Sequence, residues 1–185
     1  MTQTTRRLMV GLMMTGLVSA ARPARADDVD GETIKHVRSS NASIVALISL
    51  AGQQSKTFRG LTETIDASDG IVYVETGQCG RDVQACLVSV TTDGRGHRFL
   101  RVRVTNGKKA DWDLMGSIGH ELRHTIEVLS NRTVTDTAGL HYFYQHLDST
   151  WGVLKPFETE AAVEAGAAVR AEVQKYRRLH FPKPE

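Results

Sequence analysis

The sequence lacks any apolar run long enough to cross a membrane. Its N-terminal run, residues 8–20, has 13 residues, whereas a membrane-spanning helix needs about 20. This run follows Arg6-Arg7 and precedes Ala24-x-Ala26, which is the order of basic, apolar and small residues in a secretory signal. We therefore expect residues 1–26 to be a signal peptide that is removed, and residues 27–185 to form a single domain without a membrane span.

The chain also lacks an excess of charge of one sign once the expected signal is set aside. It holds 23 lysines and arginines against 21 acidic residues, and residues 1–26 contain four of the arginines and no acid. The basic balance therefore belongs to the signal and gives no reason to expect a nucleic-acid partner. We expect a periplasmic or secreted protein, exported by the general secretory or the twin-arginine route.

Cysteine is scarce, with only Cys79 and Cys86 present, seven residues apart. In an exported chain such a pair favours a disulfide, because the compartment is oxidising. In the chain-entropy model this short loop would stabilise the fold by about 2.5 kcal/mol. The alternative, a pair of metal ligands, is disfavoured because the spacing matches no common zinc knuckle.

The N-terminal half of the expected domain contains no repeat or low-complexity linker, so its elements can be assigned in order. Apolar periodicity predicts a helix over residues 31–50 and a second, shorter helix with Ser55 as its N-cap. β-forming residues then predict strands at 71–74, 86–90 and 98–104. The last two should pair through a hairpin turn containing Asp93-Gly94.

The C-terminal half is predicted to be helical. We expect helices over residues 112–129, 136–147 and 158–178, the first capped by Asp111 and the second by Thr135. Helices, then strands, then helices imply an α+β fold with a small antiparallel three-stranded sheet.

The helix predicted at 112–129 carries the motif His120-Glu121-Leu122-Arg123-His124, an HExxH sequence. Histidines at i and i+4 lie one turn apart on one helix face, where both can bind one metal ion. The intervening Glu121 can reach a water on that ion without being a ligand, and can act as general base. The motif therefore predicts one Zn²⁺ per chain, with His120 and His124 as ligands.

The apolar positions of the same helix indicate how the motif is oriented. One stripe of large aliphatic residues should be buried: Leu114, Ile118, Leu122, Ile126 and Leu129. At about 100° per residue the two histidines fall almost opposite this stripe. We therefore expect them to face a cleft or solvent, as ligands that must admit a substrate would.

A third zinc ligand must come from elsewhere, and Glu158 is the preferred residue. It lies one turn before Ala162 on the apolar face predicted for the last helix, and a carboxylate directed to the core needs a partner. Glu160 and Glu164 point the other way. Glu127, seven residues after His120, remains an alternative, although a solvated surface acid is the better interpretation. The remaining alternatives are His141 and His146.

An oxyanion stabiliser would be expected beside the metal. The segment 140–147 offers Tyr142 and His146 for this role, while Tyr144 lies with the apolar residues of its helix and should pack in the core.

The motif and a later helical glutamate resemble zincin metallopeptidases of the gluzincin type. The chain from 31 to 178 also looks like a group of short exported bacterial proteins of unassigned function, which share a Gly-His-Glu-Leu-x-His-x-x-Glu-Val helix and a Phe/Tyr-Glu-Thr start to a later helix. Here these are residues 119–128 and Phe157-Glu158-Thr159. The resemblance implies zinc at His120, His124 and Glu158, with Glu121 as base.

Two functions follow as expectations. The first is an exported zinc metallopeptidase acting on a peptide or protein substrate, with the peptide bound along an open sheet edge. The second is a zinc-binding or interaction module of the cell envelope without hydrolytic activity. An open fourth position on the metal would distinguish the first from the second.

Overall fold

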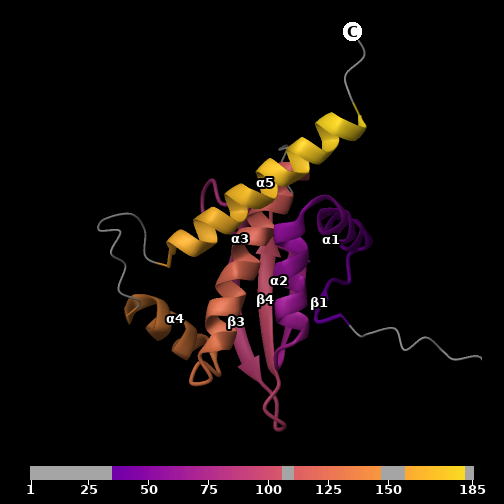
Figure 1. Ribbon diagram of the computed structural model, residues 1–185. Helices are drawn as coiled ribbons and strands as arrows, with labels where there is room; N and C mark the ends of the chain where they lie inside the picture. Colours follow the sequence, from indigo (N-terminus) through magenta and orange to yellow (C-terminus); the bar gives the residue numbers. More distant parts are fainter. Residues whose placement is uncertain (1–34, 106–110, 147–156, 182–185) are drawn as a thin grey trace, which may run out of the picture. The chain divides into compact units, whose positions relative to one another are not determined.

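A computed structural model describes residues 35–105, 111–146 and 157–181 of the chain (Figure 1). The expected signal peptide, residues 1–26, lies outside these ranges. The described part contains five helices and a four-stranded mixed sheet, so the predicted α+β class is confirmed. None of its helices combines the length and the apolar character needed to cross a membrane.

The first predicted helix is wrong in its N-terminal half. Residues Val37–Arg38 form a short strand, β1, and helix α1 runs over Ala42–Gln54. The Asn41 side chain caps α1 by accepting the backbone N–H of Ser43 at 2.9 Å, which fixes the helix start. Val37 falls within the predicted helix, but it is buried in the sheet, paired with Val72.

Helix α2, Lys56–Asp66, begins as predicted. The Ser55 hydroxyl accepts the backbone N–H of Phe58 at 3.0 Å. The same hydroxyl donates to the Glu172 carboxylate at 2.7 Å, and Thr57 donates to that carboxylate through both its backbone N–H and its hydroxyl. The negative charge of Glu172 at the N-terminus of α2 also complements the helix dipole. Through its hydrogen bonds to Ser55 and Thr57, Glu172 links α2 to the last helix.

The sheet differs from the predicted three antiparallel strands. Its order is β1-β2-β4-β3, with β2 at Gly70–Thr76, β3 at Ala85–Thr92 and β4 at Arg98–Val104. The β3–β4 hairpin is antiparallel as predicted, but β4 then pairs parallel with β2 and lies between β2 and β3. Alternating buried residues mark a strand's inner face without fixing its neighbours, so the pattern could not reveal this order.

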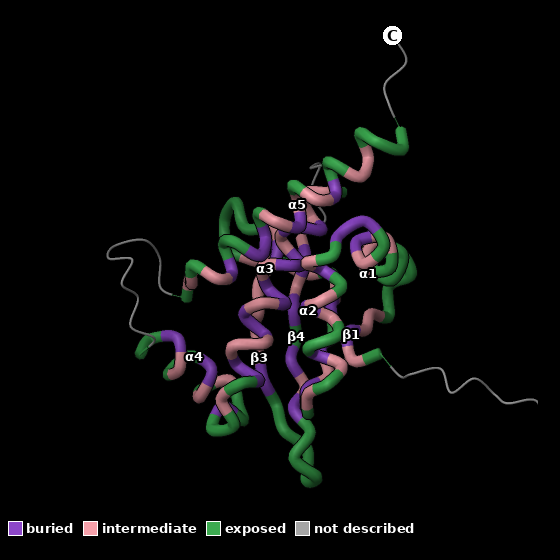
Figure 2. The backbone as a smooth tube through the Cα atoms, viewed as in Figure 1, coloured by how far each residue is buried: buried purple, intermediate pink, exposed green. Residues whose placement is uncertain are grey.

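Helix α3, Asp111–Ser130, packs on the sheet with one side and on α5, Glu160–His180, with another. Figure 2 shows buried segments along α3 and β4. The approach of α5 requires small residues on α3: a methyl carbon placed on Gly119 would lie 2.8 Å from Val169 Cγ2, and one on Gly116 would lie 2.9 Å from the Gly166 carbonyl oxygen. Large side chains at these positions would separate the two helices.

The C-terminal end of α3 is held by a buried arginine. Arg98 on β4 is 2% exposed, and its guanidinium donates to four carbonyl oxygens at and beyond the end of α3, those of Val128, Leu129, Asn131 and Val134. It also pairs with Asp69 at 2.8 Å. A positive charge at a helix C-terminus complements the dipole and the unpaired carbonyls there.

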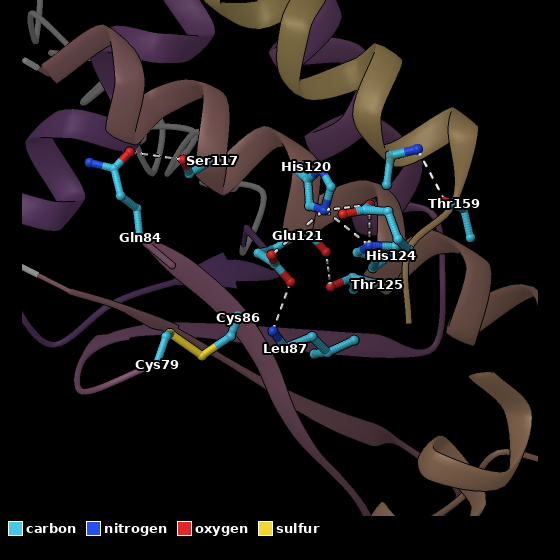
Figure 3. Close-up of polar contacts among 12 residues, drawn as sticks. Cys79, Gln84, Cys86, Leu87, Ser117, His120, Glu121, His124, Thr125 and Thr159 are labelled. Carbon is cyan, nitrogen blue, oxygen red and sulfur yellow. Dashed lines mark hydrogen bonds and ion pairs between the residues drawn. A yellow bond between two sulfur atoms is a disulfide. The ribbon is translucent and has the colours of Figure 1, made fainter. Parts of the chain in front are cut away.

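Two smaller features complete the frame around the site. Helix α4, Thr137–His146, begins one residue later than predicted, because Asp136 rather than Thr135 is the capping side chain, accepting the Gly139 N–H at 2.7 Å. The predicted disulfide joins Cys79 to Cys86 (Figure 3). It links the loop before β3 to the strand itself, one residue before Leu87.

Candidate metal centre

The motif residues lie on the middle turns of α3, and their surroundings are more enclosed than the sequence indicated. The His124 side chain is 5% exposed and that of His120 is 20% exposed. The expectation that both would face a cleft or solvent is wrong for His124. Helix α5 covers the side of α3 opposite the sheet, so α3 has two buried sides. The apolar stripe in the sequence identified only the side that packs on the sheet.

Three side-chain atoms converge where the motif predicts a metal. The Nε2 atoms of His120 and His124 are 3.1 Å apart (Figure 3). Glu158 Oε1 lies 3.1 Å from the first and 3.6 Å from the second. These three residues form a group with the ligand types and spacing that could hold a metal ion.

The spacing fits an ion bound tetrahedrally. Zinc bonds to nitrogen and to carboxylate oxygen are about 2.0–2.2 Å long, so two ligand atoms on a tetrahedral ion are about 3.3–3.5 Å apart by the same geometry. The observed 3.1–3.6 Å brackets this value. Glu158 Oε1 is also buried, and its contacts are with the two imidazole Nε2 atoms. A buried carboxylate oxygen of this kind needs a cation or donor to offset its desolvation.

The structure places Glu158 at this point for a reason that differs from the predicted one. Helix α5 begins at Glu160 with Thr159 as its N-cap, so Glu158 precedes the helix and is not on its apolar face. The preceding Phe157 has φ of 79°. This left-handed conformation costs an aromatic residue energy, so it persists only where the surrounding contacts hold it. Its ring packs edge-on against Tyr144 and His141 of α4, with centroids 5.8 and 5.6 Å apart.

The ionic state of the centre follows from these contacts. Burial raises the pKa of the Glu158 carboxyl, but hydrogen bonding and the charges of His120 and His124 outweigh it and lower this pKa to about 2. For His124, burial lowers the pKa, and the carboxylates of Glu127, Glu158 and Glu121 outweigh burial and raise it to about 9. The carboxylates and imidazoles thus stabilise one another as ion pairs, and a metal ion binding at the cluster would displace the Nε2 proton of His124.

Glu121 lies beside the cluster and is anchored to the sheet. Its Oε2 accepts the backbone N–H of Leu87 on β3 at 2.7 Å, and its Oε1 lies 3.9 Å from His120 Nε2 (Figure 3). Burial raises the pKa of this carboxyl. The pairing of β3 with β4 is irregular between Leu87 and Ser89. Such an irregularity disrupts the regular hydrogen bonds of the sheet, and it lies beside the Leu87 N–H that binds Glu121.

Glu127 is not the solvated acid that the sequence indicated. Its side chain is 13% exposed, with Oε2 at 2.9 Å from His124 Nδ1 and Oε1 accepting the Thr159 hydroxyl at 2.8 Å. It therefore contacts the nitrogen of His124 that faces away from the ligand cluster. The i, i+3 spacing from His124 could have revealed this contact, because such residues are neighbours on a helix.

Two of the other candidates, Tyr142 and His146, contact each other on α4. His146 bonds through Nδ1 to the Tyr142 carbonyl, and Tyr142 is 64% exposed. Tyr144 is buried, as predicted, and its hydroxyl donates to the His124 carbonyl oxygen at 3.2 Å. Glu160 is exposed, in keeping with its predicted direction.

Comparisons of this chain with protein-family models, with curated proteins and with solved structures gave no match. The geometry of the centre is therefore the basis for its function.

Proposed function

We propose that this protein is an exported zinc-dependent metallopeptidase, with His120, His124 and Glu158 as the zinc ligands and Glu121 as the general base. The convergence of two Nε2 atoms and one buried carboxylate oxygen within 3.1–3.6 Å carries the proposal. Two imidazoles and one carboxylate are the ligand set of several catalytic zinc sites, which keep a fourth position open.

Zinc in this centre would act as a Lewis acid and lower the pKa of a water molecule towards about 7. Glu121 supports the role of proton acceptor by position and by environment. The Leu87 N–H holds its Oε2, which leaves Oε1 directed towards the ligand cluster. Because burial raises the pKa of its carboxyl, Glu121 can take a proton from water and later donate it to a leaving amine.

Strand β3 supports a peptide as the substrate. It is the outer strand of the sheet next to β4, and it reaches the centre through the Leu87 contact to Glu121. An edge strand offers backbone N–H and C=O groups to an extended peptide. On β3 the Leu87 N–H is bound by Glu121 and the Val90 N–H and C=O by the Thr137 hydroxyl, so a peptide would pair with other residues of the strand. The disulfide at Cys86 secures this strand beside the centre, as suits a protein proposed to work in an oxidising, exported location.

The experiment that tests the proposal combines metal content with turnover of an unbiased peptide library. We expect about one zinc per chain in the purified protein, and cleavage products detectable by mass spectrometry. Glu121→Gln should retain zinc while its turnover falls about 10²–10⁴-fold, which is the usual contribution of general acid–base catalysis. Glu160→Gln, a change at an exposed acid, is the matched control.

Each alternative has its own outcome. Zinc bound at full occupancy without any cleavage would identify the second expected function, a non-catalytic module in which the ion fastens α3 to the start of α5. Equal turnover by Glu121→Gln and wild type would exclude Glu121 as the base. Zinc retained by both His120→Ala and His124→Ala would exclude the centre itself.

A further inference from the structure

Among the residues that the structure describes, Glu127 is a carboxylate beside the centre that neither belongs to the ligand cluster nor serves as the proposed base. Its two oxygens bridge two elements: Oε2 is 2.9 Å from His124 Nδ1 on α3, and Oε1 accepts the Thr159 hydroxyl at 2.8 Å. With a side chain 13% exposed, it is held in place by both partners and by an ion pair of 3.6 Å with Arg123.

Thr159 gives the second contact its importance. Its hydroxyl also accepts the Ala162 N–H at 3.2 Å, so the same group caps α5 and donates to Glu127. Thr159 directly follows Glu158 in the chain. The hydrogen bond from the Thr159 hydroxyl to Glu127 therefore also restrains the neighbouring backbone at Glu158.

We propose that Glu127 is a positioning residue that assembles the metal centre, by orienting His124 and by fixing the chain at Thr159 so that Glu158 reaches the ligand cluster. The inference rests on the metal-binding part of the proposed function, and it holds whatever substrate the centre acts on. Glu127 itself would not touch the ion or the substrate.

The effect on His124 follows from the chemistry of imidazole. A carboxylate at Nδ1 can only accept a hydrogen bond, so Nδ1 carries the proton and the lone pair of Nε2 is available on the other side of the ring. That other side faces His120 Nε2 and Glu158 Oε1. Two further contacts hold the residue: the Tyr144 hydroxyl on its carbonyl oxygen, and the Tyr144 ring edge-on at 5.3 Å.

The effect on Glu158 follows from its place in the chain. Glu158 precedes α5, so helical hydrogen bonds do not hold it. The strained Phe157 before it and the capping Thr159 after it set its position. Without the Glu127–Thr159 hydrogen bond, Thr159 no longer restrains the position of Glu158. The Glu158 side chain then has to become ordered when an ion binds.

The test uses Glu127→Gln, with Glu164→Gln as the matched control at an exposed position of α5. Thr159→Val removes the hydroxyl, and Thr159→Ser restores it. Affinity for Co²⁺ is measured by competition with a chelator. Loss of an outer-shell partner usually weakens metal binding about 10–100-fold, so Glu127→Gln and Thr159→Val should fall in this range. Thr159→Ser and Glu164→Gln should stay near wild type.

Two further measurements separate positioning from general stability. In the Co²⁺ protein, the proton NMR signal of the His124 Nδ1–H should exchange with water faster in Glu127→Gln than in Glu164→Gln. In the metal-free protein, amide hydrogen exchange should speed up at residues 160–163 in Glu127→Gln, while the melting temperature stays within a few degrees of the control.

The outcomes are distinct. Equal Co²⁺ affinity and equal amide exchange in Glu127→Gln and Glu164→Gln would overturn the proposal, even if the protein is a zinc peptidase. If wild type bound neither Co²⁺ nor zinc, the proposed function would fail, and the exchange rates of the metal-free protein would decide. Unchanged protection at residues 160–163 would overturn the positioning role, and faster exchange there would support it.

Discussion

A single added methyl group at Gly119 tests whether the contact between α3 and α5 is as close as described. In Gly119→Ala the new carbon would lie 2.8 Å from Val169 Cγ2 and 3.4 Å from Val169 Cβ. Ordinary carbon–carbon contacts are about 3.5–4.0 Å, so the shorter distance falls short by roughly 0.7–1.2 Å. Valine in a helix has one strongly preferred rotamer, and Val169 is fully buried, so the helices have to separate.

The magnitude is the difference of two effects. Overpacking a filled core costs typically 1–3 kcal/mol, and the size of this overlap at a stiff side chain places Gly119→Ala near 3. Alanine in a helix interior is about 1 kcal/mol more favourable than glycine. The net loss of stability is then about 2 kcal/mol, which corresponds to a melting temperature lower by roughly 4–8 °C for a domain of this size.

The assay is thermal unfolding of the metal-free protein in two backgrounds. Gly60→Ala on α2 is the control, because a methyl carbon there meets no atom within 4 Å and should raise stability by about 0.5–1 kcal/mol. In a Val169→Ala background the 2.8 Å contact with Cγ2 is gone and only the 3.4 Å contact with Cβ is left, so adding Gly119→Ala should stabilise by about 1 kcal/mol. The coupling between positions 119 and 169 is then about 3 kcal/mol.

Two results would contradict this close contact: a Gly119→Ala variant that melts at or above the wild-type temperature, or an effect of Gly119→Ala that is the same in both backgrounds. Either result would mean that α3 and α5 do not approach each other as closely as these distances require.

Three other changes test separate parts of the structure. Glu158→Gln should weaken zinc binding strongly while Glu160→Gln leaves it unchanged, because a neutral amide is a poor zinc ligand; equal affinities in a chelator competition would make Glu158 a mere neighbour of the site. Arg98→Met should destabilise the fold by about 3–5 kcal/mol in urea unfolding, since four carbonyl oxygens lose their donor, and a loss below 1 kcal/mol would contradict the buried network. Burial raises the pKa of Glu172, but hydrogen bonds from Ser55 and Thr57 outweigh burial and lower it. The stability that Glu172 contributes is therefore present above the ordinary glutamate pKa and is lost as pH falls through the folded-state value. The difference in melting temperature between wild type and Glu172→Gln should shrink from pH 7 to pH 3, and a constant difference would contradict this role of Glu172.

Local signals predicted the parts of the fold that local interactions determine. The Ser55 cap, the β3–β4 hairpin and the Cys79–Cys86 disulfide each depend on residues close together in the sequence. The strand β1 and the parallel pairing of β2 with β4 depend on long-range contacts. Two paired residues in β1 carry too little pattern to be distinguished from a turn of helix, so the sequence could not reveal them.

The candidate site divides in the same way. The i, i+4 spacing placed His120 and His124 on one face, because helix geometry alone determines it. Glu158 was selected by extending an apolar face to a residue that precedes the helix. Thr159, a threonine followed by a run of helix formers, is an N-cap signal that would have placed the helix start correctly. The contact of Glu127 with Thr159 depends on how α5 packs on α3, which no local pattern contains.

The ligand cluster draws on two segments separated by more than thirty residues of chain, His120 and His124 on α3 and Glu158 before α5. An unfolded chain does not hold these atoms together, so an ion that binds the cluster binds the folded state alone. By mass action it then adds stability that depends on its free concentration, about 2.7 kcal/mol when that concentration is 100 times the dissociation constant. The supply of metal around the protein would in this way set how long each molecule survives proteolysis, independently of any reaction it catalyses.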